Sequence, residues 1–165
     1  MTPQATRYIQ VVDERTVAED LFSFEAFVVT IKTGARPYGA ISRQFVAHYP
    51  TVPIADVSHG NSSAPIDLPD GKKVIFTCLW PDVEAGEGYP PEKIVACTAS
   101  AIMSALKAGL EEIALPRIGG GKARERKPAM GQGIVEAEKM FQHPRWRDIE
   151  PPEVIVTIGK RNPSP

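Results

Sequence analysis

The sequence has few of the residues that hold metals or form disulfides: two cysteines and three histidines among 165 residues. Cys78 and Cys97 stand on different predicted elements without CxxC or Cys/His spacing, so neither a zinc site nor a disulfide framework is indicated. The histidines are scattered and suggest no catalytic triad. We therefore expect two reduced core thiols, no metal, no cofactor and no histidine chemistry.

The chain also lacks a dominant charge of one sign and a long apolar run. Its 19 basic and 20 acidic side chains give a formal net charge of -1, which argues against nucleic acid as a partner. No run approaches the roughly 20 apolar residues that cross a bilayer, and the sequence does not begin with a signal-peptide pattern. We expect a cytoplasmic protein that binds no membrane and holds any anionic ligand through a local site.

The overall composition is that of a globular protein. Hydrophobic residues make up 42% of the chain and charged residues 24%. A domain of this length buries roughly 70% of the surface that its unfolded chain exposes. We expect a single domain over residues 1–165, with its core over residues 8–158 and a frayed tail over residues 159–165.

Short β-branched and aromatic runs alternate with helical patterns along the chain. The runs of strand length are residues 8–12, 27–31, 74–79, 112–115 and 154–158. Helical spacing predicts a short helix capped by Thr16 and longer ones from Ile41 toward Tyr49, over 92–110 and over 133–141.

The segment 51–73 is rich in Pro, Gly, Ser and Asn, and its half-apolar pieces at 54–57 and 66–68 predict edge strands and turns. Because neighbouring parallel strands need crossover connections, the alternating order predicts an α/β fold. Its sheet is expected to be mostly parallel, with helices on both faces.

A glycine-rich loop follows the predicted strand at 112–115. Gly119, Gly120 and Gly121 allow positive φ angles, and successive amides there can converge on phosphate oxygens. Ligands of open α/β sheets bind beyond the carboxyl ends of strands, where this loop lies. The same glycines also suit a tight connection without a ligand. A P-loop fails because Lys122 is not part of GxxxxGK[ST], and a dinucleotide fingerprint is poorly supported because no GxGxxG follows a first strand.

Two segments resemble the macrodomain family, which binds ADP-ribose. One looks like the family's strand and Pro-Arg-Ile-Gly-x-Gly loop around the diphosphate: Ile113-Ala114-Leu115-Pro116-Arg117-Ile118-Gly119-Gly120-Gly121. The other is similar to its first ligand loop and helix: Gly39-Ala40-Ile41-Ser42-Arg43-Gln44-Phe45, with Tyr49-Pro50 behind it. The resemblance spans residues 8–158 and is closest to the terminal ADP-ribose protein glycohydrolase branch and its small bacterial and phage relatives. It implies a three-layer α/β/α fold with a mixed, mostly parallel sheet.

The resemblance also implies where a nucleotide binds. Its diphosphate would lie between two loops, one containing Ile118, Gly119, Gly120, Gly121 and Lys122 and the other containing Thr33, Gly34, Gly39, Ala40 and Ile41. Asp13 or Glu14 falls where the family places an acid against the adenine amino group, although such a pair equally suits a solvated helix flank. The implied partners are ADP-ribose or a related nucleotide, and ADP-ribosylated protein.

The sequence departs from the glycohydrolase branch where that branch carries its reactive groups. The branch has an acid soon after its Gly-x-Gly, whereas the first acid here is Glu125. It also has a lysine just beyond the middle strand, where this chain reads Thr77-Cys78-Leu79-Trp80. Lys32 and Glu125 are the visible candidates for nucleophilic or acid/base work, with an exposed loop position for Lys32 as the plainer alternative. Binding is thus the main expectation, and hydrolysis of an ADP-ribosyl linkage or of a phosphate on ADP-ribose is left open.

Two further interpretations also stay open. A noncatalytic reader would keep the pocket without reactive groups. An interaction or scaffold module would keep the fold and lose the ligand, since a fold does not fix a function. The bulky run Arg36-Pro37-Tyr38, where the family keeps small glycines, could fill the phosphate channel of such a module.

Overall fold

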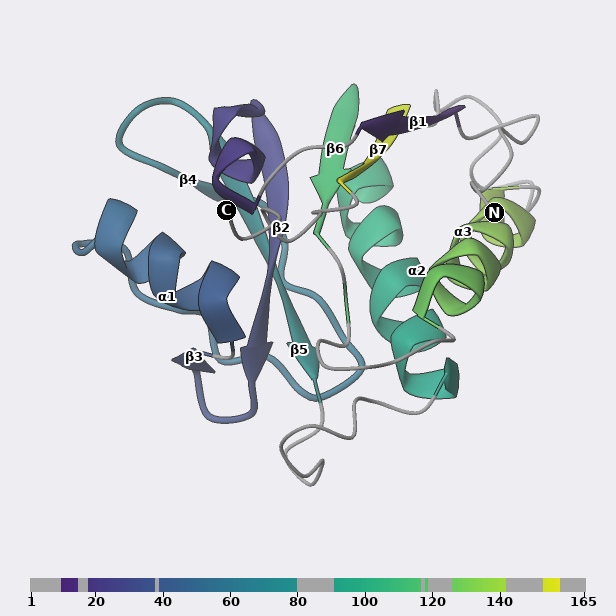
Figure 1. The fold of residues 1–165 in the computed structure, drawn as a ribbon, viewed down its shortest axis with the longest axis horizontal. Helices are drawn as coiled ribbons and strands as arrows, with labels where there is room; N and C mark the ends of the chain where they lie inside the picture. The colour runs from purple at the N-terminus through teal and green to yellow at the C-terminus, as the bar shows by residue number, and fades with distance from the viewer. Residues whose placement is uncertain are drawn as a thin grey trace, which may run out of the picture.

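The computed structural model describes residues 10–14, 18–37, 39–79, 91–116, 118, 126–141 and 153–157. Strands and helices alternate through this part of the chain (Figure 1). In order they are β1 (Gln10–Glu14), the 3-10 helix η1 (Ala18–Ser23), β2 (Ala26–Lys32), β3 (Arg36–Pro37), α1 (Gly39–His48), β4 (Ile66–Asp67), β5 (Lys73–Leu79), α2 (Pro91–Lys107), β6 (Glu112–Leu115), α3 (Arg126–Phe141) and β7 (Glu153–Thr157).

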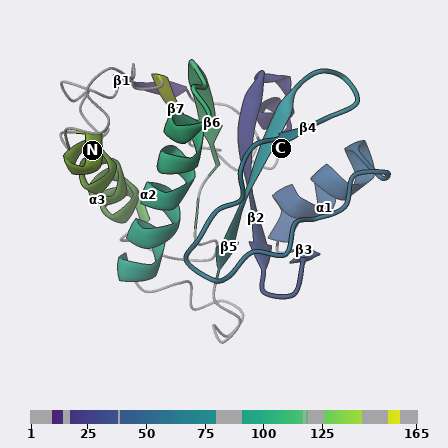
Figure 2. The same cartoon turned by 180° about the vertical axis from the view of Figure 1, so that it is seen from behind.

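The described strands form one seven-stranded sheet in the order β1-β7-β6-β2-β5-β4, with β3 pairing β2 beside this path. The neighbouring strands β1, β7, β6, β2 and β5 are all parallel to one another. β4 runs antiparallel to β5, and β3 runs antiparallel to β2. Figures 1 and 2 show α1 on one side of the sheet and α2 and α3 on the other. The predicted α/β fold with a mixed, mostly parallel sheet is therefore confirmed.

Alternate side chains of each apolar strand point to opposite faces of the sheet and are buried in two different cores. Phe27, Val29 and Ile31 pack with α1, whereas Val28 packs with α2 and α3. Along β5 the side chains alternate between the two cores in the same way. Strands covered on both faces have few polar residues, which is why these strands read as near-continuous apolar runs in the sequence, interrupted by the buried Thr30 and Thr77.

Some predicted elements were misplaced for identifiable reasons. No strand forms at residues 54–57, because Ile54, Ala55 and Val57 pack as partly buried side chains of an irregular segment against the α1-side core. The predicted edge strands reduce to β4 and a single bridge between Ser62 and Thr77. α3 begins at Arg126, seven residues before the predicted start, because Pro128 lies in its first turn, where proline is tolerated. Thr16, the predicted cap, lies outside the described residues.

Both cysteines are fully buried and free, as expected of core thiols. Burial raises the pKa of the Cys97 thiol to about 12. Burial also raises the pKa of the Cys78 thiol. Since the thiolate is the reactive form, both side chains are poor nucleophiles near neutral pH.

The helices α2 and α3 touch so closely that one position of α3 admits only glycine. A Cβ added at Gly133 would lie 2.6 Å from the Thr98 Cβ and 2.9 Å from the Val95 carbonyl oxygen. Thr98 is itself buried, and its hydroxyl donates to the Ile94 carbonyl over 2.8 Å. Neither neighbour can move away without disturbing α2.

Gly133→Ala is therefore expected to lower the free energy of unfolding by about 1–3 kcal/mol, the usual cost of overpacking a close contact. Gly131 is the matched control, because a Cβ there meets nothing within 4 Å. Gly131→Ala is expected to stabilise the protein by about 0.5–1 kcal/mol through helix propensity. Urea unfolding of both variants tests the close packing, which a stability gain from Gly133→Ala would contradict.

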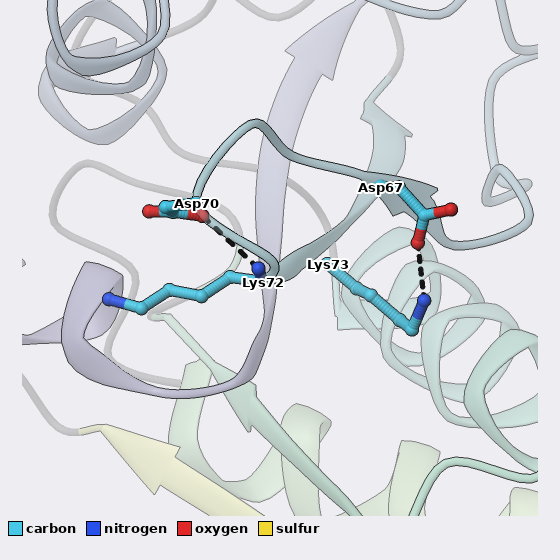
Figure 3. A network of polar contacts seen from close by, with 4 residues as sticks. All are labelled: Asp67, Asp70, Lys72 and Lys73. Atoms are coloured by element: carbon cyan, nitrogen blue, oxygen red, sulfur yellow. Dashed lines mark hydrogen bonds and ion pairs between the residues drawn. The ribbon is translucent and has the colours of Figure 1, made fainter.

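The turn between β4 and β5 is held by a small polar network (Figure 3). The Tyr49 hydroxyl donates to the Asp70 carboxylate over 2.7 Å, and the Lys72 amide donates to the same carboxylate over 3.1 Å. Lys73 forms an ion pair with Asp67, and the Lys72 ammonium donates to the Phe22 carbonyl over 2.6 Å. These contacts fasten the end of α1, η1 and the start of β5 to one another.

This network makes stability depend on pH in two windows. The hydrogen bond from Tyr49 holds the pKa of Asp70 below its ordinary 3.8, so the stability contributed by its carboxylate is lost as pH falls through that lowered value. Burial, helped by Asp70, raises the pKa of Tyr49 from 10.0 to about 12, so its contribution is lost as pH rises between those values.

We expect Tyr49→Phe to remove the alkaline slope, to reduce the acid slope to the part that Lys72 contributes, and to cost about 1 kcal/mol at neutral pH, the net worth of one hydrogen bond. Urea unfolding across the pH range measures both effects. An unchanged pH dependence in the variant would contradict the role assigned to this pair.

Candidate functional site

The carboxyl ends of the parallel strands meet at one edge of the sheet. β2 ends there at Lys32 and β5 at Leu79, and the two residues are register partners. In Figure 1 the arrowheads of β2 and β5 point to the same side of the molecule, where β3 also lies. We call this the carboxyl edge, and it is where ligands of open α/β sheets bind.

The chain leaves two adjacent strands at this edge for opposite faces of the sheet. From β2 it passes to α1, whose Phe45 belongs to one core, and from β6 it passes to α3, whose Ile134 belongs to the other. β2 and β6 are neighbours in the sheet. Such a divergence is a topological switch point, the position of the binding crevice in doubly wound sheets.

The loop after β2 turns sharply at residues 33–35. Gly34 and Ala35 both have positive φ angles, +85° and +57°, and the left-handed conformation at Gly34 explains why glycine stands there. The Arg36 Nε donates to the Thr33 carbonyl over 3.0 Å, and β3 then pairs back onto the last two residues of β2. The turn thus places Thr33 and Gly34 beyond the end of β2 at the carboxyl edge.

The predicted ligand residues Gly39, Ala40 and Ile41 form the first turn of α1. Because α1 follows β3, its amino end lies at the carboxyl edge. The first four amides of a helix have no partner inside the helix, and the helix dipole favours an anion beside them. The first turn of α1 carries no acidic side chain that would oppose an anion.

The loop after β6 is described only at its start. Pro116 and Ile118 are buried, and Ile118 belongs to the core formed with α2 and α3. A ligand contact at Ile118 would therefore have to come from its backbone. The predicted ligand residues Gly119, Gly120, Gly121 and Lys122, and the candidate catalytic residue Glu125, lie outside the described residues.

The other predicted site residues stand at the ends of β1 and β2. Asp13 and Glu14 are the last residues of β1, paired with Val156 and Thr157 of β7. Lys32 is the half-buried last residue of β2, rather than an exposed loop residue. β1 lies three strand positions from β2, a separation of roughly 14 Å at the usual strand spacing. The sheet thus brings Asp13, Glu14 and Lys32 to the same carboxyl edge, but the two acids and the lysine lie apart along that edge.

Arg36 and Pro37 bear on the interpretation that bulky residues fill the phosphate channel. Both are exposed, so neither is packed into the protein interior. Tyr38, the third residue of that run, lies outside the described residues. The described part of the loop therefore gives no support to a collapsed channel.

The 58–61 turn, which lies at the end of β5, has no distinct signal in the sequence. The Gly60 amide donates to the Cys78 carbonyl over 2.8 Å, and the Cys78 amide donates to the Asn61 carbonyl over 3.0 Å. Its position could not be read from the Pro, Gly and Ser composition of residues 51–73, because the turn is fixed by pairing with a strand that follows later in the chain.

A separate hollow of about 450 Å³ lies at the opposite, amino edge. Its lining includes Glu25, Lys73 and Glu112, at or beside the first residues of β2, β5 and β6. We favour the carboxyl edge as the functional site, because the strand order creates a switch point there and the amino edge has no such feature.

Neither a metal-binding cluster nor a membrane-spanning helix is found among the described residues. Within the residue ranges given for the fold, no group of three or more His, Cys, Asp or Glu is placed to hold a metal ion. None of the described helices is both long and apolar enough to span a bilayer.

Fold and edge geometry together define a three-layer α/β/α domain with a candidate ligand site at a topological switch point.

Comparison of the sequence with protein-family models and with curated proteins gives no match. Solved structures do match. The macrodomain of Thermus aquaticus DarG is 19% identical with a TM-score of 0.62, covering 90% of this chain and 97% of that one. The macrodomain of Mycobacterium tuberculosis DarG is 17% identical with a TM-score of 0.64, covering 90% and 96%.

A Trypanosoma brucei macrodomain solved in complex with ADP-ribose also matches, at 18% identity and a TM-score of 0.55, over 91% of this chain and 64% of that one. The chain therefore has the macrodomain fold, which confirms the fold that the resemblance of its two sequence segments implies. The assignment to the glycohydrolase branch within that fold stays a prediction.

Proposed function

We propose that this protein binds ADP-ribose, or a related adenine nucleotide, at the carboxyl edge. The observation that carries the proposal is the divergence of the chain from β2 and β6 to opposite faces, with the amino end of α1 at the same edge. A similar fold holds ADP-ribose in the Trypanosoma brucei macrodomain. The glycine-rich sequence after β6, Gly119-Gly120-Gly121, is of the kind that suits an anion-binding loop, which supports the proposal.

The positions of the residues suggest a direction for the ligand along the edge. Asp13 or Glu14, at the end of β1, would accept from the adenine amino group. The first-turn amides of α1 and the backbone of Gly119, Gly120 and Gly121 would bind the diphosphate. The terminal ribose would then lie beside Thr33 and Gly34, on the β5 side of the site.

Calorimetric titration with ADP-ribose tests this proposal, with adenosine as the control that lacks the diphosphate. Saturable binding of ADP-ribose that is much tighter than that of adenosine is expected, because the site is built around an anion. Absence of saturable ADP-ribose binding would instead favour an interaction module that kept the fold and lost the ligand.

Hydrolysis is the second candidate function, favoured by the position of Lys32. This lysine is half-buried at the last residue of β2, next to the turn proposed to hold the terminal ribose. The neutral Lys32 amine could attack the ribose carbon while Glu125 donates a proton to the leaving group, and a water that gives its proton to the Glu125 carboxylate would then cleave the lysine–ribose bond and release ADP-ribose. The substrate would be ADP-ribosylated protein, or ADP-ribose carrying a phosphate.

Incubation with ADP-ribosylated protein, followed by mass spectrometry of the products, separates turnover from binding. A catalytic role for Lys32 predicts release of ADP-ribose by the wild type and none by Lys32→Gln, with ADP-ribose affinity changed little. Substrate that stays intact despite demonstrated binding would leave a noncatalytic reader.

A further inference from the structure

The 58–61 turn is built onto the carboxyl half of β5. The Asn61 amide donates to the Ser58 carbonyl over 3.0 Å, and Gly60 has a φ angle of +81°. Two hydrogen bonds join the turn to Cys78, as described above. Ser63 exchanges further bonds with Phe76, both through its amide and through its hydroxyl. The turn is therefore fixed to the sheet as a continuation of its edge.

The far end of this segment is fastened to α2. The Ser62 hydroxyl lies 2.7 Å from that of Ser100, and the Ser104 hydroxyl donates to the Ser63 carbonyl over 2.6 Å. Contacts on two elements leave the turn little freedom to shift. A side chain carried by it is thus held at a defined place on the carboxyl edge.

The turn stands on the β5 side of the proposed terminal-ribose position. The Cys78 thiol lies 3.9 Å from the Thr33 hydroxyl, to which it donates a weak hydrogen bond, while its backbone holds the 58–61 turn. Thr33 and the turn therefore flank the end of β5 from its two sides. A ligand that runs from β1 past β6 to β2 points toward β5, so a group attached to its terminal ribose would meet this turn.

The turn carries two exposed side chains that can read such a group. His59 and Asn61 are both exposed, and an imidazole and a carboxamide can each donate and accept hydrogen bonds. A polypeptide backbone offers both kinds of partner, whereas the overall charge of -1 gives no field for the polyanion of a nucleic acid.

We propose that the 58–61 turn determines specificity at the carboxyl edge, with His59 and Asn61 contacting a polypeptide joined to the terminal ribose. This inference rests on the proposed binding of ADP-ribose. The turn distinguishes conjugated from free ADP-ribose, because its residues contact the attached polypeptide rather than the nucleotide.

Two probes test the proposal: free ADP-ribose, and a short peptide with one ADP-ribose on a serine. His59→Ala is expected to weaken binding of the conjugated peptide about threefold to tenfold, the effect of losing one hydrogen bond, and to leave ADP-ribose affinity unchanged. His59→Gln should restore part of the loss, because its amide also donates and accepts. If the wild type cleaves the peptide, the same comparison is made on kcat/KM.

His48→Ala is the matched control, since His48 is also exposed but ends α1 at the far end from the site, stacked on Phe22. It should change neither affinity. Two results would overturn the role of the 58–61 turn without affecting the proposed function. One is equal affinity of the wild type and His59→Ala for the conjugated peptide. The other is a wild type that binds ADP-ribose but does not bind that peptide. Failure of the wild type to bind either probe would instead remove the proposed function.

Discussion

Gly120→Glu is expected to abolish binding of ADP-ribose. If the backbone of the loop after β6 cradles the diphosphate, a carboxylate at this position enters the same space and adds like charge. Unit charges 4 Å apart repel by about 4 kcal/mol near a protein surface. We therefore expect the affinity measured by calorimetry to fall by at least about 100-fold, with the thermal midpoint of the variant reporting that it is folded.

Ala108→Glu is the matched control for this experiment. It adds the same charge at an exposed residue just after α2, beside the hollow at the amino edge. ADP-ribose affinity should be unchanged in this variant. The opposite pattern, with Gly120→Glu binding normally and Ala108→Glu binding weakly, would move the ligand to the amino edge and contradict the proposed site.

Phe45→Ala is expected to have the largest effect on stability. The Phe45 side chain is fully buried, and its ring lies 5.1 Å from that of Tyr49 and 5.3 Å from that of Phe76, measured between centroids. Further rings surround it at 6.4 Å, those of Phe22 and Phe27. Truncation leaves a cavity among aromatic groups from η1, β2, β5 and the residue that follows α1, and such substitutions cost about 3–5 kcal/mol.

Thermal unfolding measures this loss, which corresponds to a midpoint lower by roughly 6–20 °C for a protein of this size. The neighbouring Val46 is the control, because it lies on the same helix and is 38% exposed. Val46→Ala should stay within about 0.5 kcal/mol of the wild type. A cost below about 1 kcal/mol for Phe45→Ala would show that the aromatic cluster is not the centre of the α1-side core.

The strands of the central sheet were predictable because their burial leaves a local mark. β2 and β5 are covered on both faces, so nearly all their residues are apolar, with one buried threonine in each, and the runs stand out in the sequence. The alternation of such runs with helical patterns then required crossovers and a parallel sheet. These features depend on the identity of neighbouring residues, which the sequence displays directly.

The segment between α1 and β5 was less predictable because its structure depends on distant partners. Ile54 and Val57 are apolar, yet they pack on a core formed by other elements and pair with no strand. Ser62 and Ser63, which look like loop residues, pair with β5 and α2 instead. Nothing local distinguishes the two cases.

The candidate site could be predicted in position more readily than in chemistry. Glycines at the loops and the first turn of α1 mark the carboxyl edge, and the sheet brings Lys32, Thr33 and Gly34 to it. The position of the 58–61 turn beside the end of β5 follows only from the hydrogen bonds of Cys78, a residue that the sequence identifies merely as an apolar position in a strand.

A crystal structure of the protein with ADP-ribose tests the central claim most directly. The nucleotide is predicted to lie along the carboxyl edge, with its diphosphate between the first turn of α1 and the loop after β6 and its terminal ribose beside Thr33. A nucleotide bound in the amino-edge hollow beside Glu25 and Glu112, or a carboxyl edge left empty at saturating ADP-ribose, would contradict it.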